Sequence, residues 1–283
     1  MEVTVGVLAL QGAFKEHLLL LHLAAACLAS KNGADDAQYI FTQVRTPSQL
    51  DTCDALIIPG GESTTMALVA ARSNLLEPLR QFVKGYRKPT WGTCAGLILL
   101  AESANRTKKG GQDLIGGLDV RVNRNHFGRQ TESFQAHLDL PFLASPHVNP
   151  SDTNTTFHGI FIRAPIVEKI LPWHAGVQTE EEKSEATIVA PSQKADGEAA
   201  EAAVEHQVEI LAKLPGRTSA FSADHVDIAD KEAGDIIAVR QGNVFGTSFH
   251  PELTSDPRIH VWWLEQVRTA VEKRRHIEQK AHQ

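Results

Sequence analysis

Several features that would mark a secreted, membrane or metal-binding protein are missing from this chain of 283 residues. It has only three cysteines, Cys27, Cys53 and Cys94, and no Cys-x-x-Cys pair, which argues against a disulfide framework and a zinc knuckle. The longest apolar stretch, residues 18–29, is too short to cross a bilayer, and the N-terminus lacks the basic segment of a signal peptide. We therefore expect a soluble, cytoplasmic protein that holds no metal and no cofactor.

An excess of positive charge is also absent. The 28 Lys and Arg residues are outnumbered by 34 Asp and Glu residues, which gives a formal net charge of −6. Because no dense stripe of basic residues runs along the chain, we expect neither nucleic acid nor a membrane surface as a partner. The hydrophobic share of 42% and the charged share of 22% are those of a globular protein that can bury a core.

Short apolar runs alternate with amphipathic segments through the first third of the chain. The pattern predicts strands at residues 3–10, 39–44, 55–58 and 89–93, and helices at 14–30, 64–71, 75–86 and 95–102. Such alternation favours a central, mostly parallel sheet that is covered by helices on both faces. The expected fold class is therefore α/β, a three-layer sandwich that forms one domain over residues 1–283.

The later part of the chain has a different pattern. Strands with polar interruptions are predicted at residues 118–123, 133–140 and 159–163, further strands at 236–240 and 243–249, and a closing helix at 258–275. The first three are expected to form a small antiparallel extension. The next two flank Gln241-Gly242, which predicts a hairpin.

Residues 178–205 fit neither pattern. Glu, Ala, Lys, Ser and Gln dominate this segment, and large apolar residues are almost absent. Such a composition buries too little apolar surface to offset the entropy cost of ordering the chain. We predict a flexible, solvated acidic insertion that is at most partly helical. A shorter polar stretch, residues 145–156, is predicted to be another surface loop.

The strongest local signal is Gly92-Thr93-Cys94-Ala95-Gly96, between a short strand and an apolar helix. It has the form Gly-x-nucleophile-x-Gly, with cysteine in the central place. The two glycines let strand and helix approach closely, while the turn strains the backbone of the cysteine. Cys94 is thus the candidate nucleophile at a helix start, where the dipole favours a thiolate and the N–H of Ala95 can bind an oxyanion.

A thiol nucleophile needs a base, and His250 is the candidate. It closes an apolar strand, at the place where active sites of parallel sheets form. Pro251 fixes the backbone after it, and Glu252 can bind the imidazole and set its tautomer. The chain has 13 histidines. We read the others, His17 and His260 among them, as surface or satisfied core residues.

A glycine loop, Pro59-Gly60-Gly61-Glu62-Ser63-Thr64, follows one predicted strand and precedes a helix. Two glycines can expose backbone N–H groups to a ligand, and Ser63 or Thr64 can cap the helix. The spacing matches neither phosphate-binding pattern, Gly-x-x-x-x-Gly-Lys or Gly-x-Gly-x-x-Gly. We therefore interpret it as an oxyanion loop that faces Cys94.

Together these segments resemble the class I glutamine amidotransferases, which use a Cys-His-Glu triad. More narrowly, the chain resembles the glutaminase subunits of pyridoxal 5′-phosphate synthase. The broad likeness rests on residues 59–66 (PGGESTTM), 92–97 (GTCAGL) and 248–253 (SFHPEL), and the narrow one on residues 6–13 (GVLALQGA), 124–130 (RNHFGRQ) and 161–165 (FIRAP). It covers most of the chain but not residues 145–156 and 178–205.

The resemblance implies hydrolysis of L-glutamine to L-glutamate and ammonia, with the ammonia passed to a (β/α)₈-barrel synthase subunit. It implies that Cys94 is the nucleophile, His250 the base and Glu252 its orienter. The implied contacts to glutamine are Gly61, Glu62, Ser63, Arg124, Ile162 and Arg163, and the implied oxyanion donors are Gly61 and Ala95.

Three other interpretations stay open on the sequence alone. One is a glutaminase that serves a different synthase, of the imidazole-glycerol-phosphate or anthranilate type. Another is a cysteine peptidase or esterase on a related fold, and the third is an inactive scaffold that only binds the synthase. The Leu-Gln-Gly-Ala and Phe-Gly-Arg-Gln stretches argue against the first, the glycine loop and Arg124 against the second, and an intact Cys94, His250 and Glu252 against the third.

Overall fold

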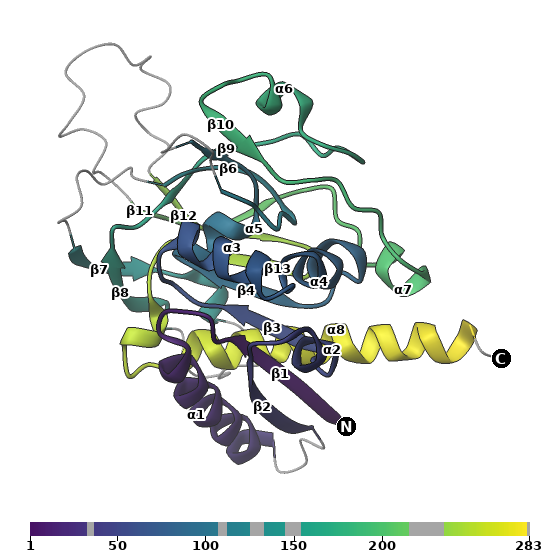
Figure 1. Ribbon diagram of the computed structural model, residues 1–283. Helices are drawn as coiled ribbons and strands as arrows, with labels where there is room; N and C mark the ends of the chain where they lie inside the picture. The colour runs from purple at the N-terminus through teal and green to yellow at the C-terminus, as the bar shows by residue number, and fades with distance from the viewer. Residues whose placement is uncertain (33–36, 107–111, 125–132, 145–153, 215–234, 282–283) are drawn as a thin grey trace.

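A computed structural model describes residues 1–32, 37–106, 112–124, 133–144, 154–214 and 235–281 (Figure 1). Within these ranges eleven strands join in one sheet, and two more form a separate antiparallel ribbon. The strands of the main sheet are β1 (Glu2–Leu8), β2 (Gln38–Val44), β3 (Ala55–Ile58), β4 (Thr90–Thr93), β5 (Ala101–Asn105), β6 (Leu118–Asn123), β9 (Ile166–Ile170), β10 (Thr187–Val189), β11 (Glu209–Leu214), β12 (Asp235–Gln241) and β13 (Val244–Thr247). The ribbon pairs β7 (Ser133–Asp139) with β8 (Thr156–Ile162).

The main sheet has a parallel half and a mixed half. Its order is β10-β5-β6-β9-β12-β13-β4-β3-β1-β2, with β11 paired to β12. From β2 to β13 all neighbours are parallel, whereas β12 pairs antiparallel with β13, β9 and β11. The expected mostly parallel centre with an antiparallel extension is confirmed, and so is the hairpin between β12 and β13.

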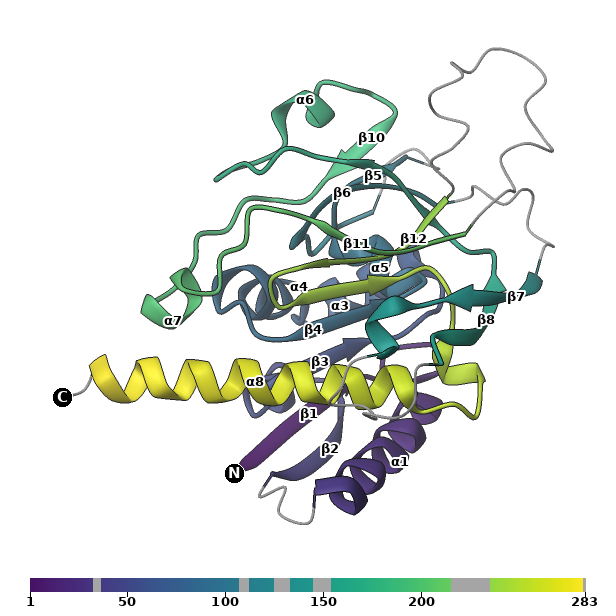
Figure 2. The same cartoon turned by 180° about the vertical axis from the view of Figure 1, so that it is seen from behind.

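Helices cover both faces of the sheet, as Figures 1 and 2 show from opposite sides. The helical segments are α1 (Phe14–Asn32), α2 (Pro47–Asp51), α3 (Ser63–Arg72), α4 (Leu76–Arg80), the π-helical turn η1 (Gln81–Gly85), α5 (Ala95–Leu100), the 3₁₀ turn η2 (Pro141–Ala144), α6 (Thr179–Glu182), α7 (Glu198–Glu201), the 3₁₀ turn η5 (Pro251–Leu253) and α8 (Arg258–Ala281). Helices α1 and α8 lie on one face, and α3, α4 and α5 lie on the other. This arrangement confirms the three-layer α/β fold class.

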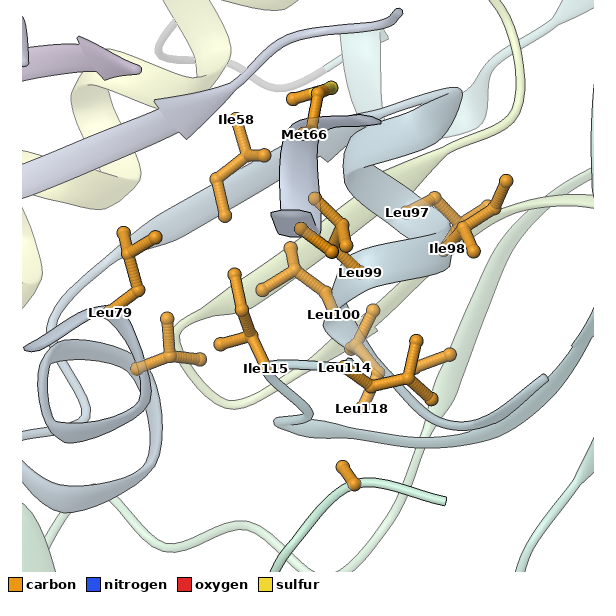
Figure 3. Close-up of a cluster of buried hydrophobic side chains, with 14 of the residues drawn as sticks. Ile58, Met66, Leu79, Leu97, Ile98, Leu99, Leu100, Leu114, Ile115 and Leu118 are labelled. Atoms are coloured by element: carbon orange, nitrogen blue, oxygen red, sulfur yellow. The ribbon is translucent and has the colours of Figure 1, made fainter. Parts of the chain in front are cut away.

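The core follows the two-residue alternation of the strands. In β3, Ala55 and Ile57 pack in the apolar cluster beneath α1 and α8, whereas Leu56 and Ile58 pack in the cluster beneath α3 to α5. Figure 3 shows part of the second cluster, in which Ile58 and Met66 lie near the leucines of α5. A central strand that is apolar on both sides is therefore clamped between two helical layers. Its carboxyl end is held firmly in place.

The structure differs from the sequence prediction after the nucleophile motif. The predicted helix 95–102 ends at Leu100, and the next five residues form β5. An apolar run suits a buried helix and a buried strand equally well, so pairing with β6 and β10 decides the outcome. The predicted helix 75–86 is divided into α4 and η1, where the N–H of Tyr86 bonds to the carbonyl of Gln81. The strands β9 and β11 were not predicted.

The structure adds elements within the predicted insertion at residues 178–205 that the sequence did not indicate, and more than half of the residues of this segment are exposed. The segment contains α6, β10 and α7, and β10 extends the sheet by pairing with β5. Glu181 is buried, and its carboxylate accepts a hydrogen bond from Ser103 Oγ at 3.0 Å and lies 3.3 Å from Lys169 Nζ. Hydrogen bonds and ion pairs such as these hold the segment against the sheet, although it contains few large apolar residues. Flexibility of this segment stays a prediction, as does the single-domain boundary.

Two other expectations meet the limits of the described residues. Most of the predicted loop at residues 145–156 lies outside them, and so does the Asn125 to Gln130 part of the 124–130 stretch. In the part of the chain that the structure describes, no helix is long and apolar enough to cross a membrane.

Candidate active site

Three parallel strands end at one edge of the sheet and bring the predicted motifs together. In the ladder, Thr93 of β4 pairs with Thr247 of β13, and Gly92 pairs with Ile58 of β3. Cys94 follows β4 directly, and its N–H donates to the carbonyl of Thr247 at 2.8 Å. Residues that follow parallel strands share one edge, which is where sites form in open α/β sheets.

Cys94 stands on a strained turn that only glycine neighbours permit. Its φ of 49° and ψ of −101° lie in a region that residues with a side chain rarely adopt. A Cβ on Gly96 would lie 2.0 Å from the carbonyl oxygen of Ile58, and one on Gly92 would lie 2.5 Å from the Gly96 backbone. The predicted nucleophile turn is therefore present. Cys94 Sγ lies 3.8 Å from the carbonyl oxygen of Ile162, at the end of β8.

His250 and Glu252 form a buried pair beside Cys94. His250 Nδ1 lies 2.7 Å from Glu252 Oε1, and the backbone N–H of His250 is fixed on the carbonyl of Ile160 at 2.8 Å. Burial opposes a charge on the ring, but hydrogen bonds to Cys94 and Glu252 and the charges of both raise the pKa of His250 to about 10. Burial likewise opposes ionisation of Glu252, yet the neighbouring His17 and His250 hold its pKa below the ordinary value.

The glycine loop packs directly on this pair through Gly60, which is not among the predicted site residues. A Cβ on Gly60 would lie 2.3 Å from His250 Cε1 and 3.4 Å from Cys94 Cβ. Gly61, the predicted oxyanion donor, lies next to the side chain of Gln11, which also accepts the N–H of Glu62 at 3.0 Å. The adjacent glycines in the sequence were the only available signal for Gly60. The oxyanion roles of Gly61 and Ala95 stay predictions.

The expected cap of α3 is wrong. The helix begins at Ser63, and Glu62 caps it by accepting the N–H groups of Thr64 at 3.1 Å and Thr65 at 2.6 Å. Partial burial opposes ionisation, but these bonds and the hydroxyl of Thr65 lower the pKa of Glu62 to about 2. A carboxylate serves as a cap as well as a hydroxyl does, so the choice between neighbours could not be made from sequence.

Arg124 joins the glycine loop from the end of β6. Its side chain is buried, and Nη2 donates to Ser63 Oγ at 3.0 Å and to Thr64 Oγ1 at 2.9 Å. Gln112, which is not among the predicted site residues, accepts from the same two hydroxyls. No motif surrounds Gln112 in the sequence, so nothing distinguished it from the other glutamines of the chain.

Arg163, another predicted contact to glutamine, is not buried as Arg124 is. Arg163 is exposed and has a φ of 47°, directly after Ile162, whose carbonyl faces Cys94. Among the predicted residues, the structure thus places Cys94, His250 and Glu252 together and groups Glu62, Ser63 and Arg124 around the start of α3.

Comparisons with known proteins agree with this geometry. The model of the SNO glutamine amidotransferase family matches residues 7–200 and 201–269. The chain is similar to the probable pyridoxal 5′-phosphate synthase subunit PDX2 of Arabidopsis thaliana, with 40% identity over 93% of this chain and 85% of the relative. It is also similar to the pyridoxal 5′-phosphate synthase subunit PdxT of Herpetosiphon aurantiacus, with 37% identity over 92% of this chain and 98% of the relative.

A solved structure supports the same class. A crystal structure of a glutamine amidotransferase matches with a TM-score of 0.58 and 32% identity, over 93% of this chain and 98% of that chain. The fold and the matches define an enzyme of the glutamine amidotransferase class, which hydrolyses glutamine. Within that class, the chain belongs to the SNO glutamine amidotransferase family.

Proposed function

We propose that this chain is the glutaminase subunit of a pyridoxal 5′-phosphate synthase and that Cys94 is its nucleophile. The observation that carries the proposal is the convergence of Cys94, His250 and Glu252 where β4 and β13 end side by side. Hydrolysis of L-glutamine to L-glutamate and ammonia is the reaction of the family. Relatives named as pyridoxal 5′-phosphate synthase subunits support the choice of the synthase.

The α3 end of the site has the charges that an amino acid substrate needs. Arg124 is a buried cation beside the hydroxyls of Ser63 and Thr64, and it suits the α-carboxylate of glutamine. Glu62 stays ionised because of its helix-cap bonds, and it suits the α-ammonium group. The carbonyl of Ile162 lines the space next to the sulfur. Glutamine bound in this way presents its side-chain amide to Cys94.

The first half of the reaction forms a thioester. A protonated His250 beside Cys94 is the setting that favours a reactive thiolate. The sulfur attacks the amide carbon of glutamine, and negative charge develops on the amide oxygen. Hydrogen bonds from the N–H groups of Gly61 and Ala95 stabilise that charge. The C–N bond then breaks. His250 gives its proton to the departing nitrogen, which leaves as ammonia, and a γ-glutamyl thioester remains on Cys94.

The second half uses His250 in the opposite direction. The ring, now neutral, takes a proton from water, and the resulting hydroxide attacks the thioester carbon. The C–S bond breaks, glutamate leaves, and the thiolate and imidazolium are restored. Glu252 keeps the ring in one tautomer through both halves and stabilises its charged form, because its Oε1 accepts the Nδ1 proton.

The ammonia acceptor in this proposal is the synthase subunit, a (β/α)₈ barrel. Direct transfer would keep ammonia from being protonated in water before it reaches the second active site. We retain the cytoplasm as the proposed compartment, since Cys27, Cys53 and Cys94 are all free thiols.

A single substitution separates the two halves of the proposed function. In the complex with the synthase subunit, Cys94→Ala should abolish pyridoxal 5′-phosphate formation from glutamine. It should leave formation from added ammonium salt intact, because the barrel does not need the thiol when ammonia is supplied. Cys27→Ala removes a half-buried thiol of α1, away from the site, and is the matched control. The readouts are ammonia release and product absorbance.

Three outcomes would each overturn a different part of this proposal. Glutamine hydrolysis that persists in Cys94→Ala would remove the nucleophile assignment. Hydrolysis of peptides or esters in preference to glutamine would favour a cysteine hydrolase. Wild-type glutaminase activity that rises only with a different synthase would change the partner.

A further inference from the structure

Two buried histidines behind the triad have no part in the mechanism above. His17 lies in the first turn of α1 and His260 in the first turn of α8, and both side chains are fully buried. Burial, together with the neighbouring rings, lowers the pKa of His17 to about 3, although Glu252 opposes the shift. Burial alone lowers the pKa of His260 to about 3. Both rings are therefore neutral at neutral pH, and each has one donor and one acceptor nitrogen.

The two rings form a line that ends at the triad carboxylate. His260 Nε2 lies 3.0 Å from His17 Nδ1. On its other side, His17 Nε2 lies 3.4 Å from Glu252 Oε2 and 3.3 Å from Thr93 Oγ1, in the residue before Cys94. Glu252 Oε2 is itself buried and has no well-aligned hydrogen-bond partner among the described residues. The Nε2 of His17 therefore faces two possible acceptors, the hydroxyl of Thr93 and this second carboxylate oxygen.

The unpaired atoms choose between the two possible proton arrangements. If His17 carried its proton on Nδ1, its Nε2 lone pair would face the Glu252 carboxylate, and His260 would bury an N–H at Nδ1 with no acceptor. If His260 donates from Nε2, His17 carries its proton on Nε2, where Thr93 Oγ1 at 3.3 Å and Glu252 Oε2 at 3.4 Å can share it. Only an acceptor nitrogen of His260 is then left without a partner, which is the cheaper defect.

A third ring, the indole of Trp91, encloses the two histidines but offers the carboxylate no donor. Trp91 packs edge-on against both histidines, with ring centroids 5.5 Å from His17 and 4.8 Å from His260. Its indole N–H donates to Thr247 Oγ1 at 3.2 Å and cannot serve the carboxylate. The indole therefore packs as an apolar surface against both imidazoles and restricts their rotation.

We propose that His17, oriented by His260, is a positioning residue that holds the second oxygen of Glu252. The inference rests on the proposed function, because it assigns the pair of Glu252 and His250 to catalysis. A carboxylate held through one oxygen can rotate about its side-chain bond, and the His250 ring rotates with it. A second donor fixes the carboxylate plane and hence the direction of His250 Nε2 toward Cys94. A neutral donor does so without drawing the charge of Glu252 away from His250.

The same chain segment also supports the glycine loop. Gly12 has a φ of 83°, and a Cβ there would lie 1.6 Å from the carbonyl oxygen of Gly60, while Gln11 accepts the N–H of Glu62. The turn between β1 and α1 therefore contacts the Gly60 loop, and the first turn of α1 reaches Glu252 through His17. A displacement of His17 would first move the carboxylate of Glu252. Of the pair His250 and Glu252, this carboxylate is the part that the structure shows in contact with His17.

Paired substitutions of His17 test this role. His17→Gln can place an amide N–H near the position of Nε2, whereas His17→Asn reaches only toward His260 and leaves Glu252 Oε2 without a donor. His17→Met keeps the volume and removes both polar atoms. His22→Leu, an exposed histidine on the same helix, is the control. Each variant is first checked for folding by circular dichroism and then assayed with the synthase subunit.

We expect kcat for glutamine to fall roughly 10–100-fold in His17→Asn and His17→Met, the usual effect of removing a group that orients an active-site ligand. KM should change little, because His17 does not touch glutamine. His17→Gln should recover most of the rate. The pH profile of Cys94 alkylation by iodoacetamide should move to higher pH in His17→Asn and stay at the wild-type position in His17→Gln and His22→Leu.

The alkylation profile needs no glutamine, so it separates the two proposals. If the wild-type complex with the synthase subunit released no ammonia from glutamine, the proposed function would fail, while the profile would still test His17. A folded His17→Asn with the wild-type profile and kcat overturns the inference, and so does a loss of rate that His17→Gln does not recover. If His17→Met does not fold, the comparison of Gln with Asn decides the matter.

Discussion

At the residue scale, the proposed chemistry depends on the charge of the His250 ring. Burial disfavours a charged His250 imidazole, but hydrogen bonds to Cys94 and Glu252 and the electrostatic influence of both outweigh it and raise the pKa of the ring. The sequence indicated the partners through the spacing His-Pro-Glu and the nucleophile turn. It could not indicate how far burial and the two charges balance, because that depends on which surfaces close over the ring.

Removing the thiol should therefore lower the pKa of His250. We expect the ring to titrate near pH 10 in the wild type and at a clearly lower pH in Cys94→Ala, because the sulfur supplies both a hydrogen bond and a charge. Nitrogen NMR of histidine-labelled protein measures this directly, and Cys27→Ala should titrate as the wild type does. Equal midpoints in Cys94→Ala and wild type would show that the thiol and the ring are not coupled.

The same shift has a consequence for stability. The folded pKa of about 10 lies above the ordinary value of 6.5, so protonation of His250 stabilises the folded state. That contribution is fully present below pH 6.5 and is lost as pH rises through 10. Cys94→Ala should weaken this alkaline loss, because its His250 titrates closer to the ordinary value.

At the element scale, the site depends on how closely α5 approaches β3. Gly96 leaves no room for a side chain, since a Cβ would lie 2.0 Å from a backbone oxygen of Ile58. Backbone cannot yield as a flexible side chain can. The motif Gly-x-Cys-x-Gly thus predicted a packing requirement as well as a nucleophile.

We expect Gly96→Ala to destabilise the fold by at least about 1–3 kcal/mol, the usual cost of overpacking a core. The added methyl group pushes the end of β3, and with it the Gly60 loop, away from Cys94. Chemical denaturation measures the loss. Gly176→Ala is the control, because its Cβ would meet nothing within 4 Å, and it should change stability by no more than about 0.5 kcal/mol. A Gly96→Ala protein as stable as wild type would contradict this account of the turn.

Element prediction from the sequence succeeded where periodicity and turn residues agreed. The strands β1 to β4 and their helices lie within a few residues of the predicted bounds, because Pro59, Gly60 and Gly92 punctuate apolar runs. It failed at β5, where a buried helix passes directly into a buried strand without a breaker. It also failed at β10 and Glu181, where ion pairs and sheet pairing, invisible in composition, hold a polar segment in place.

At the scale of the whole molecule, function arises from the meeting of segments that are far apart in the chain. The nucleophile turn and the His-Pro-Glu spacing indicated Cys94, His250 and Glu252, and the parallel ladder of β3, β4 and β13 explains why they meet. The sequence could not reveal the layer behind them. His17 and His260 come from the helices of the opposite face, and their meeting depends on how α1 and α8 pack beneath the sheet.

The central claim is that Cys94 is the thiol that attacks glutamine, and covalent labelling tests it most directly. The complex with the synthase subunit is treated with a chloroketone analogue of glutamine, and the modified peptide is identified by mass spectrometry. The account predicts a single label on Cys94, slowed by added glutamine and absent from Cys94→Ala. A label on Cys27 or Cys53 with Cys94 unmodified would contradict it.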